Sequence, residues 1–364
     1  MNTTDLLQTA VNPVSRLSAI LLLLFALSCP APAHVPILAG DNDNITGALH
    51  ISDAAKSWAA YGSLGGGAHY YSIDVQQGDR IYLSLFKSAD PGEGDFQPAL
   101  ALLGPGLPPE NSTLPRSSLR LSLPPWASEL KTLAAEASGA ASAVYEPFGP
   151  SSFIEISEIN ITAPESARYY AAVYNANNNN NRNNSSILAD NGSSGHYGLA
   201  VGYKEQFSFS DRITTPLRLI SVYLWEGQSL AMILIPYFAA ELIGFLAFLR
   251  GSRRTYFCLA GTLAGFFFLA TAATIINQMA FSLTRAPFGP EVYITLAIAL
   301  FNVLLGVAAI RLARGEAGVL QRALLTVLGT IALLAGSGLL LGPLLAMAAS
   351  FLPSRRGSIL AVRG

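Results

Sequence analysis

The sequence predicts a membrane protein of the α+β class, in which an extracytoplasmic all-β sandwich is followed by a transmembrane helical bundle. Three observations carry this prediction. The chain has 364 residues, of which 51% are hydrophobic and only 12% are charged, whereas about 25% of the residues of a soluble protein are charged. Residues 34–212 alternate apolar and polar positions with the period of β-strands. Long apolar runs fill residues 218–352.

Charge and cysteine content exclude two classes of protein. The formal net charge of −1 leaves no basic field that would attract nucleic acid, so we expect no nucleic-acid partner. The two cysteines, Cys29 and Cys258, lie in separate apolar runs. No disulfide framework is therefore expected, and the β region must fold by burying apolar surface.

Residues 1–33 have the features of a signal peptide. Arg16 precedes the apolar run at residues 17–28, and the pattern Ala31-Pro32-Ala33 resembles a signal-peptidase site. Cleavage there would make His34 the new N-terminus. An uncleaved anchor and a lipid-modified Cys29 are the alternatives.

The region 34–212 is predicted to form a β-sandwich. Aromatic and β-branched residues recur with period two in seven segments, with glycine-containing turns between them. The seven predicted strands cover residues 57–64, 69–75, 80–86, 99–103, 153–161, 169–174 and 197–203. We expect two surface insertions, at residues 108–143 with a short helix at 128–137, and at residues 175–195 with an Asn-rich tract.

Four apolar runs follow, each long enough to cross a hydrocarbon core of about 30 Å. They cover residues 230–249, 256–283, 292–312 and 323–352, and a basic tail occupies residues 353–364. Tyr223 and Trp225 precede the first run, where an aromatic belt would lie. Glycines and Pro343 interrupt the fourth run. It forms either one tilted span, which we favour, or two short half-helices that return to the same side.

Arginines in the short loops between these runs predict the orientation. The first and third loops carry three arginines each, and the second carries one. The positive-inside rule therefore places the first and third loops in the cytoplasm and the β-sandwich outside. We expect an integral protein of the plasma membrane or the secretory pathway, in contact with the lipid bilayer.

The predicted outer region carries six Asn-x-Ser/Thr sequences, the acceptor pattern for N-glycosylation. The six asparagines are Asn44, Asn111, Asn160, Asn183, Asn184 and Asn191. Asn-rich sequence also produces such triplets by chance, so their density indicates a glycoprotein without fixing which sites are used.

Residues 68–85 (AHYYSIDVQQGDRIYLSL) resemble the central hairpin of bacterial prepeptidase C-terminal (PPC) domains, where a tyrosine pair, a glycine turn and alternating apolar residues recur. Residues 98–106 are similar to that family's next strand, and residues 169–174 and 196–201 to its closing hairpin. The resemblance covers residues 48–203 and implies a jelly-roll-like sandwich with an accessory or binding role, but no catalytic residue. The whole layout resembles a group of membrane proteins from archaea and microbial eukaryotes with such an ectodomain, a helical bundle and no assigned activity.

Histidines and acidic loops of the outer region are the candidate metal ligands. An N-terminal His34 would chelate copper through its amine and ring if His69 or His196 lay nearby, although partly buried histidines in strands are the more ordinary interpretation. The acidic loops at residues 41–44 and 90–95 offer oxygen ligands for calcium, but neither has the spacing of a known calcium loop.

Glu241 is the single acidic residue well within an apolar run, the first, and Asn302 lies at a similar distance from the cytoplasmic end in the third. A carboxyl group inside a membrane is costly unless it is hydrogen-bonded or functional, so we predict a hydrogen bond between these two side chains. The small-residue pairs Gly261/Gly265 and Gly338/Gly342 permit close helix packing, either within the bundle or between copies in a homo-oligomer.

The sequence contains no Gly-x-Ser-x-Gly, His-Glu-x-x-His or phosphate-binding motif, so an enzyme is not expected. The preferred hypothesis is a membrane-anchored surface protein whose β-sandwich binds a ligand, a glycan or a protein partner. The alternatives are a small transporter or sensor that uses Glu241, and a copper-binding ectodomain that uses His34.

Overall fold

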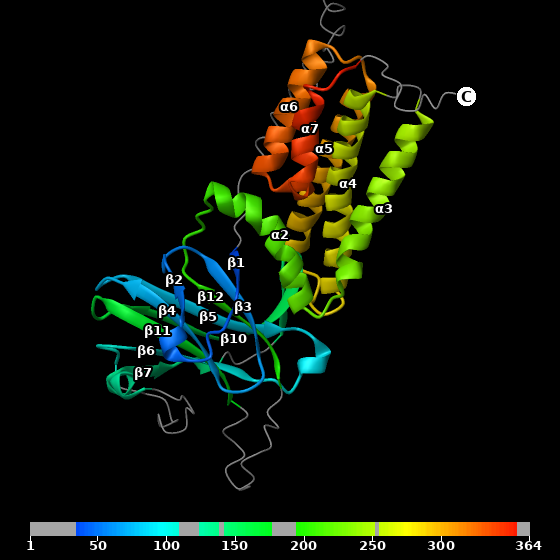
Figure 1. Cartoon of the computed structure of the whole chain (residues 1–364). Coiled ribbons are helices and arrows are strands. Elements are labelled where there is room, and N and C mark those ends of the chain that lie inside the picture. The colour runs from blue at the N-terminus through cyan, green and yellow to red at the C-terminus, as the bar shows by residue number, and fades with distance from the viewer. Residues whose placement is uncertain (1–33, 109–123, 138–141, 177–193, 252–254, 355–364) are drawn as a thin grey trace, which may run out of the picture.

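The computed structural model describes residues 34–108, 124–137, 142–176, 194–251 and 255–354. Within these residues the chain forms two parts, an N-terminal β region and a C-terminal helical region (Figure 1). The predicted signal peptide at residues 1–33 lies outside the described residues, as do residues 355–364 of the basic tail.

The β region consists of two sheets. Sheet A has the strand order β1-β3-β12-β5-β10-β8, with β9 also paired to β10, and sheet B has the order β2-β4-β11-β6-β7. The pairs β1/β3 and β2/β4 are parallel, and the other pairs are antiparallel. The strands of sheet A are β1 (Val35–Leu38), β3 (Trp58–Leu64), β5 (Arg80–Ser88), β8 (Glu136–Ala137), β9 (Ala143–Glu146), β10 (Ser151–Thr162) and β12 (Gly195–Val201). Those of sheet B are β2 (Leu49–Ile51), β4 (Ala68–Val75), β6 (Pro98–Gly104), β7 (Lys131–Ala134) and β11 (Ala167–Asn175).

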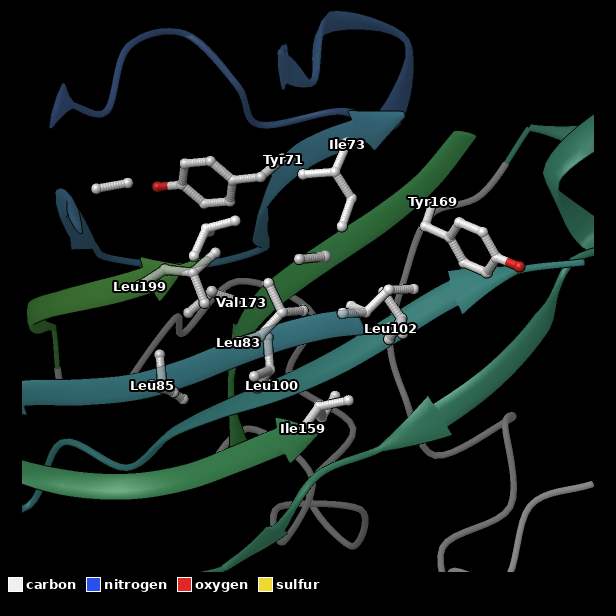
Figure 2. Close-up of a cluster of buried hydrophobic side chains, with 14 of the residues drawn as sticks. Tyr71, Ile73, Leu83, Leu85, Leu100, Leu102, Ile159, Tyr169, Val173 and Leu199 are labelled. Carbon is white, nitrogen blue, oxygen red and sulfur yellow. The ribbon is translucent and has the colours of Figure 1, made fainter. Parts of the chain in front are cut away.

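The core of the β region lies between the two sheets (Figure 2). Leu83, Leu85 and Leu199 of sheet A pack with Leu100 and Val173 of sheet B, and each of these side chains is at most 1% exposed. Alternate residues of a strand point to the same face, so the period-two pattern of the sequence supplies this layer directly. Burial of each such side chain contributes roughly 1.5–3 kcal/mol.

All seven predicted strands are confirmed, within a few residues at their ends. The helix predicted at residues 128–137 is wrong, because this stretch forms a short 3₁₀ turn (Pro125–Glu129) followed by β7 and β8. These two strands pair with β6 and β10, so part of the predicted insertion extends both sheets. Much of the second insertion, residues 177–193, lies outside the described residues.

A helix that the sequence analysis did not predict connects the two parts. Helix α2 (Phe209–Trp225) begins with a capping box, in which Ser208 and Asp211 each bond the other's backbone N–H through a side chain. It packs on β1 and β3 of sheet A and also contacts α3, α6 and the turn after α6 (Figure 1). The boundary predicted at residues 212–218 therefore falls inside a helix that belongs to both parts.

Three long helices follow: α3 (Leu230–Arg250), α4 (Tyr256–Ser282) and α5 (Glu291–Arg314). Among the described residues, these are the helices long and apolar enough to cross a membrane. At 1.5 Å per residue they are about 31, 40 and 36 Å long. The length of α4 exceeds the roughly 30 Å of a hydrocarbon core by about two helical turns.

The fourth apolar run is not a single span, so the interpretation we favoured from the sequence is wrong. It forms α6 (Val319–Leu334), a turn with the short 3₁₀ segment η6 (Ser337–Leu339), and α7 (Leu341–Ala349). Hydrogen bonds from Arg322 and Thr326 near the start of α6 to Ser350 show that the chain returns toward its starting end. Gly336 and Gly338 adopt φ values of +69° and +75°, which glycine allows without a steric penalty.

Both small-residue pairs lie inside the bundle. A Cβ atom at Gly261 would lie 2.6 Å from Ala313 Cβ, and one at Gly265 would lie 2.5 Å from a side-chain carbon of Ile310. Gly338 and Gly342 pack in the same way against the Phe268 ring. These glycines serve close approach of helices within one chain, which is the first of the two predicted roles; a contact between copies stays a prediction.

Candidate functional site

The junction between sheet A and the helical region is built around Trp225, the last residue of α2. Its indole is 7% exposed, and its ring centroid lies 5.1 Å from that of Tyr61 and 6.0 Å from that of Phe86. The indole Nε1 donates to the carbonyl oxygens of Gly62 and Tyr197, each at 3.1 Å. The prediction that Trp225 belongs to an aromatic belt is wrong, because protein surrounds the ring and uses its N–H.

The next residue, Glu226, is fully buried and joins three elements. Its carboxylate accepts hydrogen bonds from Ser152 N on β10 at 2.7 Å and from Gln228 Nε2 at 3.2 Å. Gln228 Nε2 also donates to Gln278 Oε1 on α4 at 2.5 Å. Burial raises the pKa of the Glu226 carboxyl to about 7, although the Ser152 N–H and the charge of Arg285 oppose this rise.

Further polar contacts fix the two parts to each other. Lys56 forms an ion pair with Asp211 of α2 at 2.6 Å. Arg285, in the loop between α4 and α5, bonds the Asp90 carboxylate at 3.3 Å and the Glu226 carbonyl at 2.8 Å. The Tyr145 hydroxyl on β9 bonds Thr295 Oγ1 on α5 at 2.7 Å. The β region is therefore held against one end of the helices at several separate points.

A cavity of about 420 Å³ lies just inside this junction. Its walls come from α2, α3, α4, α5 and the turn after α6, and Phe148 and Pro150 of the β region close one side. Most of the lining side chains are aliphatic or aromatic. Small-molecule sites in proteins are mostly apolar cavities of about 300–1,000 Å³ with a few placed polar groups, and this cavity has both properties.

One face of α2 forms the longest wall of the cavity. The α2 residues that line it are Arg212, Thr215, Pro216, Leu219, Ile220 and Tyr223. Their spacing of three, one, three, one and three residues places them on a single face of the helix. Tyr223, predicted with Trp225 to lie in an aromatic belt, is instead 5% exposed and lines this wall.

Three residues that line the cavity each have a buried side-chain oxygen without a hydrogen-bond partner in the described part of the chain: Asn302 Oδ1, Thr274 Oγ1 and Thr215 Oγ1. Asn302 is 2% exposed and Thr274 is 7% exposed. A buried polar atom without a partner costs about 1–3 kcal/mol, so native proteins keep few of them. Their presence around one apolar cavity, on α2, α4 and α5, is the arrangement expected of groups that hydrogen-bond a ligand.

A smaller cavity of about 130 Å³ lies on the other side of α2, against the outer face of sheet A. Glu146, Glu155 and Tyr61 contribute polar groups to it, and burial raises the pKa of the Glu146 carboxyl to about 7. Leu219 lines both cavities, so α2 is the wall between them.

The structure does not bring the predicted copper ligands together. His34 Nδ1 shares a hydrogen bond with Ser57 Oγ at 2.5 Å, and His69 Nδ1 shares one with Tyr197 OH at 2.7 Å. His196 forms an ion pair with Glu93, which raises the pKa of its imidazole. Among the residues that the structure describes, no three His, Cys, Asp or Glu side chains converge on a point that could hold a metal ion.

The acidic loops proposed for calcium have structural partners instead. In the second loop, Asp90 pairs with Arg285 and Glu93 pairs with His196. In the first, Asn42 is buried and its amide donates to Tyr70 O, while Asp43 accepts from the neighbouring amide of Asn44. The carboxylates of the second loop therefore neutralise cations of the protein itself.

The predicted hydrogen bond between Glu241 and Asn302 is wrong. The Asn302 amide donates to Ile298 O of its own helix at 2.9 Å, and Glu241 Oε1 is buried without a partner among the described residues. Asn302 lines the large cavity, whereas Glu241 lines neither of the two cavities. The two residues therefore belong to different surroundings.

Two of the six glycosylation candidates lie among the described residues, and both are exposed. Asn44 caps a short 3₁₀ turn, and its side-chain oxygen accepts from Thr46 Oγ1 and Gly47 N. Asn160 lies on β10 and accepts from Arg80 Nε. Asn111, Asn183, Asn184 and Asn191 lie outside the described residues.

No protein-family model matches this chain, and no curated protein matches it significantly. The resemblance to PPC domains is therefore still a prediction, and the chemistry of the site has to be argued from this chain's own residues.

Sequence reasoning identified Asn302 but missed the residues that surround it. The α2 face could have been found, because its apolar residues recur at helical spacing between residues 212 and 223. Two features hide it: Pro216 lies inside the helix, and the preceding strands suggest that the β pattern continues. Glu226, Gln228 and Gln278 carry no sequence signal, since contacts between distant elements bring them together.

Proposed function

We propose that this chain is an integral membrane protein that binds a largely apolar ligand at the junction between an outward-facing β region and its membrane helices. The observation that carries the proposal is the buried Asn302, which lines a 420 Å³ apolar cavity and whose Oδ1 has no hydrogen-bond partner among the described residues. The expected ligand-binding role is kept, but the site moves from the sandwich to the junction.

Three features support the membrane assignment and its orientation. The helices α3, α4 and α5 have the length and composition of spans. Arg250, Arg311 and Arg314 lie in the last turns of α3 and α5, which run away from the β region, and Arg322 lies in the first turn of α6 (Figure 1). The positive-inside rule then puts the β region outside. Arg285, at the opposite end, is paired with Asp90.

The position of the cavity supports a lipid-like ligand. Thr271 and Thr274 line it and follow the start of α4 by 15 and 18 residues, which corresponds to depths of about 22 and 27 Å at 1.5 Å per residue. If the start of α4 lies at the inner surface, this depth is near the outer edge of a hydrocarbon core of about 30 Å. Transport through Glu241 gains no such support, because that residue lines neither cavity.

Photolabelling of the full chain in lipid nanodiscs tests the proposal. The probe is a hexadecanol that carries a diazirine in its chain, and labelled peptides are identified by mass spectrometry. We expect saturable labelling of α2 and of the α4 and α5 segments that line the cavity. Excess unlabelled hexadecanol should compete for these positions, but not for Phe238 and Leu242, which are 71% and 60% exposed on α3.

The variant Asn302→Leu keeps the size of the side chain and removes the amide. Loss of one ligand hydrogen bond should weaken saturable labelling by roughly 2- to 10-fold, from about 0.5–1.5 kcal/mol. The matched control is Thr330→Val on the exposed face of α6, which should label as the native protein does. Equal, non-saturable labelling of the cavity and of α3 would show that the cavity binds nothing and would refute the proposal.

A further inference from the structure

One charged side chain lines the large cavity, that of Arg212 in the first turns of α2. It is half-buried, and its guanidinium has no ion pair, hydrogen bond or aromatic partner in the described part of the chain. The adjacent Asp211 does not neutralise it, because Asp211 pairs with Lys56 and caps the helix. A partly exposed guanidinium therefore lines an apolar cavity without a partner among the described residues.

Arg212 lies at one end of the cavity. Its backbone lies beside Gly336, in the turn between α6 and α7, and Tyr223 lies at the other end of the same α2 face. Eleven residues separate them, which is about 16 Å along a helix. Between the two ends the α2 wall consists of Thr215, Pro216, Leu219 and Ile220. The site is thus elongated, apolar along its length and cationic at one end.

From this geometry, and given the ligand-binding role proposed above, we propose that the ligand is a single-chain amphiphile with an anionic head group. Arg212 bonds the carboxylate or phosphate head, and the chain lies along α2 toward Tyr223. A guanidinium suits this role because its planar set of N–H donors matches the oxygens of a carboxylate or a phosphate. The Thr215 hydroxyl, three residues further along α2, offers a further donor on this wall.

Each feature of the cavity sets part of the specificity. Hydrogen bonds to charged groups contribute about 1.5–3 kcal/mol, so the head group should contribute roughly 10- to 100-fold in affinity. Each buried methylene of the tail should add about fourfold, until the chain exceeds the cavity. A neutral alcohol of equal chain length keeps the affinity from the buried tail and loses the affinity from the charged head group.

Competition photolabelling of the full chain in phosphatidylcholine nanodiscs tests this inference. Two diazirine probes of equal chain length are used, hexadecanoic acid and hexadecanol, in an alkaline buffer that ionises the carboxyl group. Unlabelled hexadecanoic acid, a lysophosphatidic acid and hexadecanol are the competitors. The first two should compete at concentrations roughly 10- to 100-fold lower than the alcohol. If hexadecanoic acid competes more strongly, the head group is a carboxylate; if the lysophosphatidic acid does, it is a phosphate monoester.

The variants assign the effect to one side chain. Arg212→Gln should weaken the two anionic competitors by roughly 10- to 100-fold and the alcohol by less than about threefold. Arg212→Lys keeps the charge but loses the planar set of N–H donors, so it should weaken the anionic competitors less than Arg212→Gln does. Arg311→Gln is the matched control, since it removes the same charge from an exposed position at the far end of α5. It should change nothing.

The outcomes separate this inference from the proposed function. Equal competition by the acid and the alcohol, unaffected by Arg212→Gln, would overturn the anionic head group while leaving an apolar ligand site. No saturable labelling of the cavity by either probe would overturn both.

Discussion

The two halves of helix α4 face different surroundings. In the half remote from the β region, Gly261 and Gly265 let α5 and α6 approach closely, and Ala264 and Phe268 are fully buried. In the half next to the β region, Thr271 and Thr274 line the 420 Å³ cavity. The end of the helical region remote from the β region is therefore closely packed, whereas the end next to the β region contains a cavity and polar groups.

The half of the helical region next to the β region contains the features that lower stability. In the described helices and the loops between them, six residues with unpartnered buried polar atoms lie on segments that meet the β region or line the cavity: Thr215, Gln228, Thr274, Gln278, Ser282 and Asn302. Glu241 of α3 is the exception, because it lines neither cavity. Such atoms and voids both lower stability, and natural proteins retain them mainly at functional sites. The near half therefore has the properties of a binding site, and the far half those of a scaffold.

Removal of the junction tryptophan should have the largest effect. Trp225→Ala deletes a ring that is 7% exposed and leaves the carbonyl oxygens of Gly62 and Tyr197 without its N–H. We expect a loss of about 3–5 kcal/mol in the free energy of unfolding, measured by chemical denaturation in detergent. Trp126→Ala is the control, because that ring is 48% exposed, and it should cost less than about 1 kcal/mol. Equal effects of both variants would show that α2 is not held by Trp225.

The second prediction is that the free energy of unfolding depends on pH through Glu226, at the junction with the β region. The folded-state pKa of Glu226 is raised to about 7 from 4.5, so the folded protein binds this proton more tightly than the unfolded chain does. The stabilisation is complete below about pH 4.5 and is lost as the pH rises toward 7, by up to about 3 kcal/mol.

Unfolding measured across this pH range should show that fall, and Glu226→Gln should reduce it. A residual slope is expected because Glu146 also has a pKa of about 7. Glu158→Gln, at an exposed position on β10, is the control and should leave the pH profile unchanged. An unchanged profile in Glu226→Gln would mean that this carboxyl does not control the stability of the junction.

The same contrast explains what the sequence could and could not predict. Strands such as β4 and β5 follow from period-two alternation, and α3 and α5 follow from continuous apolar runs, because each pattern is local. The far half of α4 was also partly foreseen, since Gly261 and Gly265 are four residues apart on one helix face.

The near half depends on contacts between residues far apart in sequence. Gln228 bonds Gln278 across 50 positions, and Ser152 bonds Glu226 across 74. No spacing rule connects such residues, so Asn302 could be singled out as polar but was assigned the wrong partner. The reversal after Leu334 was one of two alternatives, and the choice depended on how Gly336 and Gly338 pack against other helices.

The smallest expected effects come from two substitutions, one in each half of α4, that each change the side chain by about one methyl group. In the far half, Gly265→Ala puts a Cβ atom 2.5 Å from an Ile310 side-chain carbon and 2.7 Å from the backbone oxygen of Gly306, which cannot move independently. Crowding of a packed core costs about 1–3 kcal/mol, and the better helix propensity of alanine offsets part of this cost. We expect a net loss of roughly 1–2 kcal/mol in the free energy of unfolding in detergent.

In the near half, Thr274→Val replaces the unpartnered hydroxyl by a methyl group of nearly the same shape. Removal of a buried polar atom without a partner should leave stability unchanged or raise it by up to about 1 kcal/mol. The two variants should change the free energy of unfolding in opposite directions if close packing stabilises the far half and the near half forms a ligand site. If Thr274→Val destabilised the protein as much as Gly265→Ala, the hydroxyl would have to contribute to the fold itself. The contrast between scaffold and site along α4 would then be wrong.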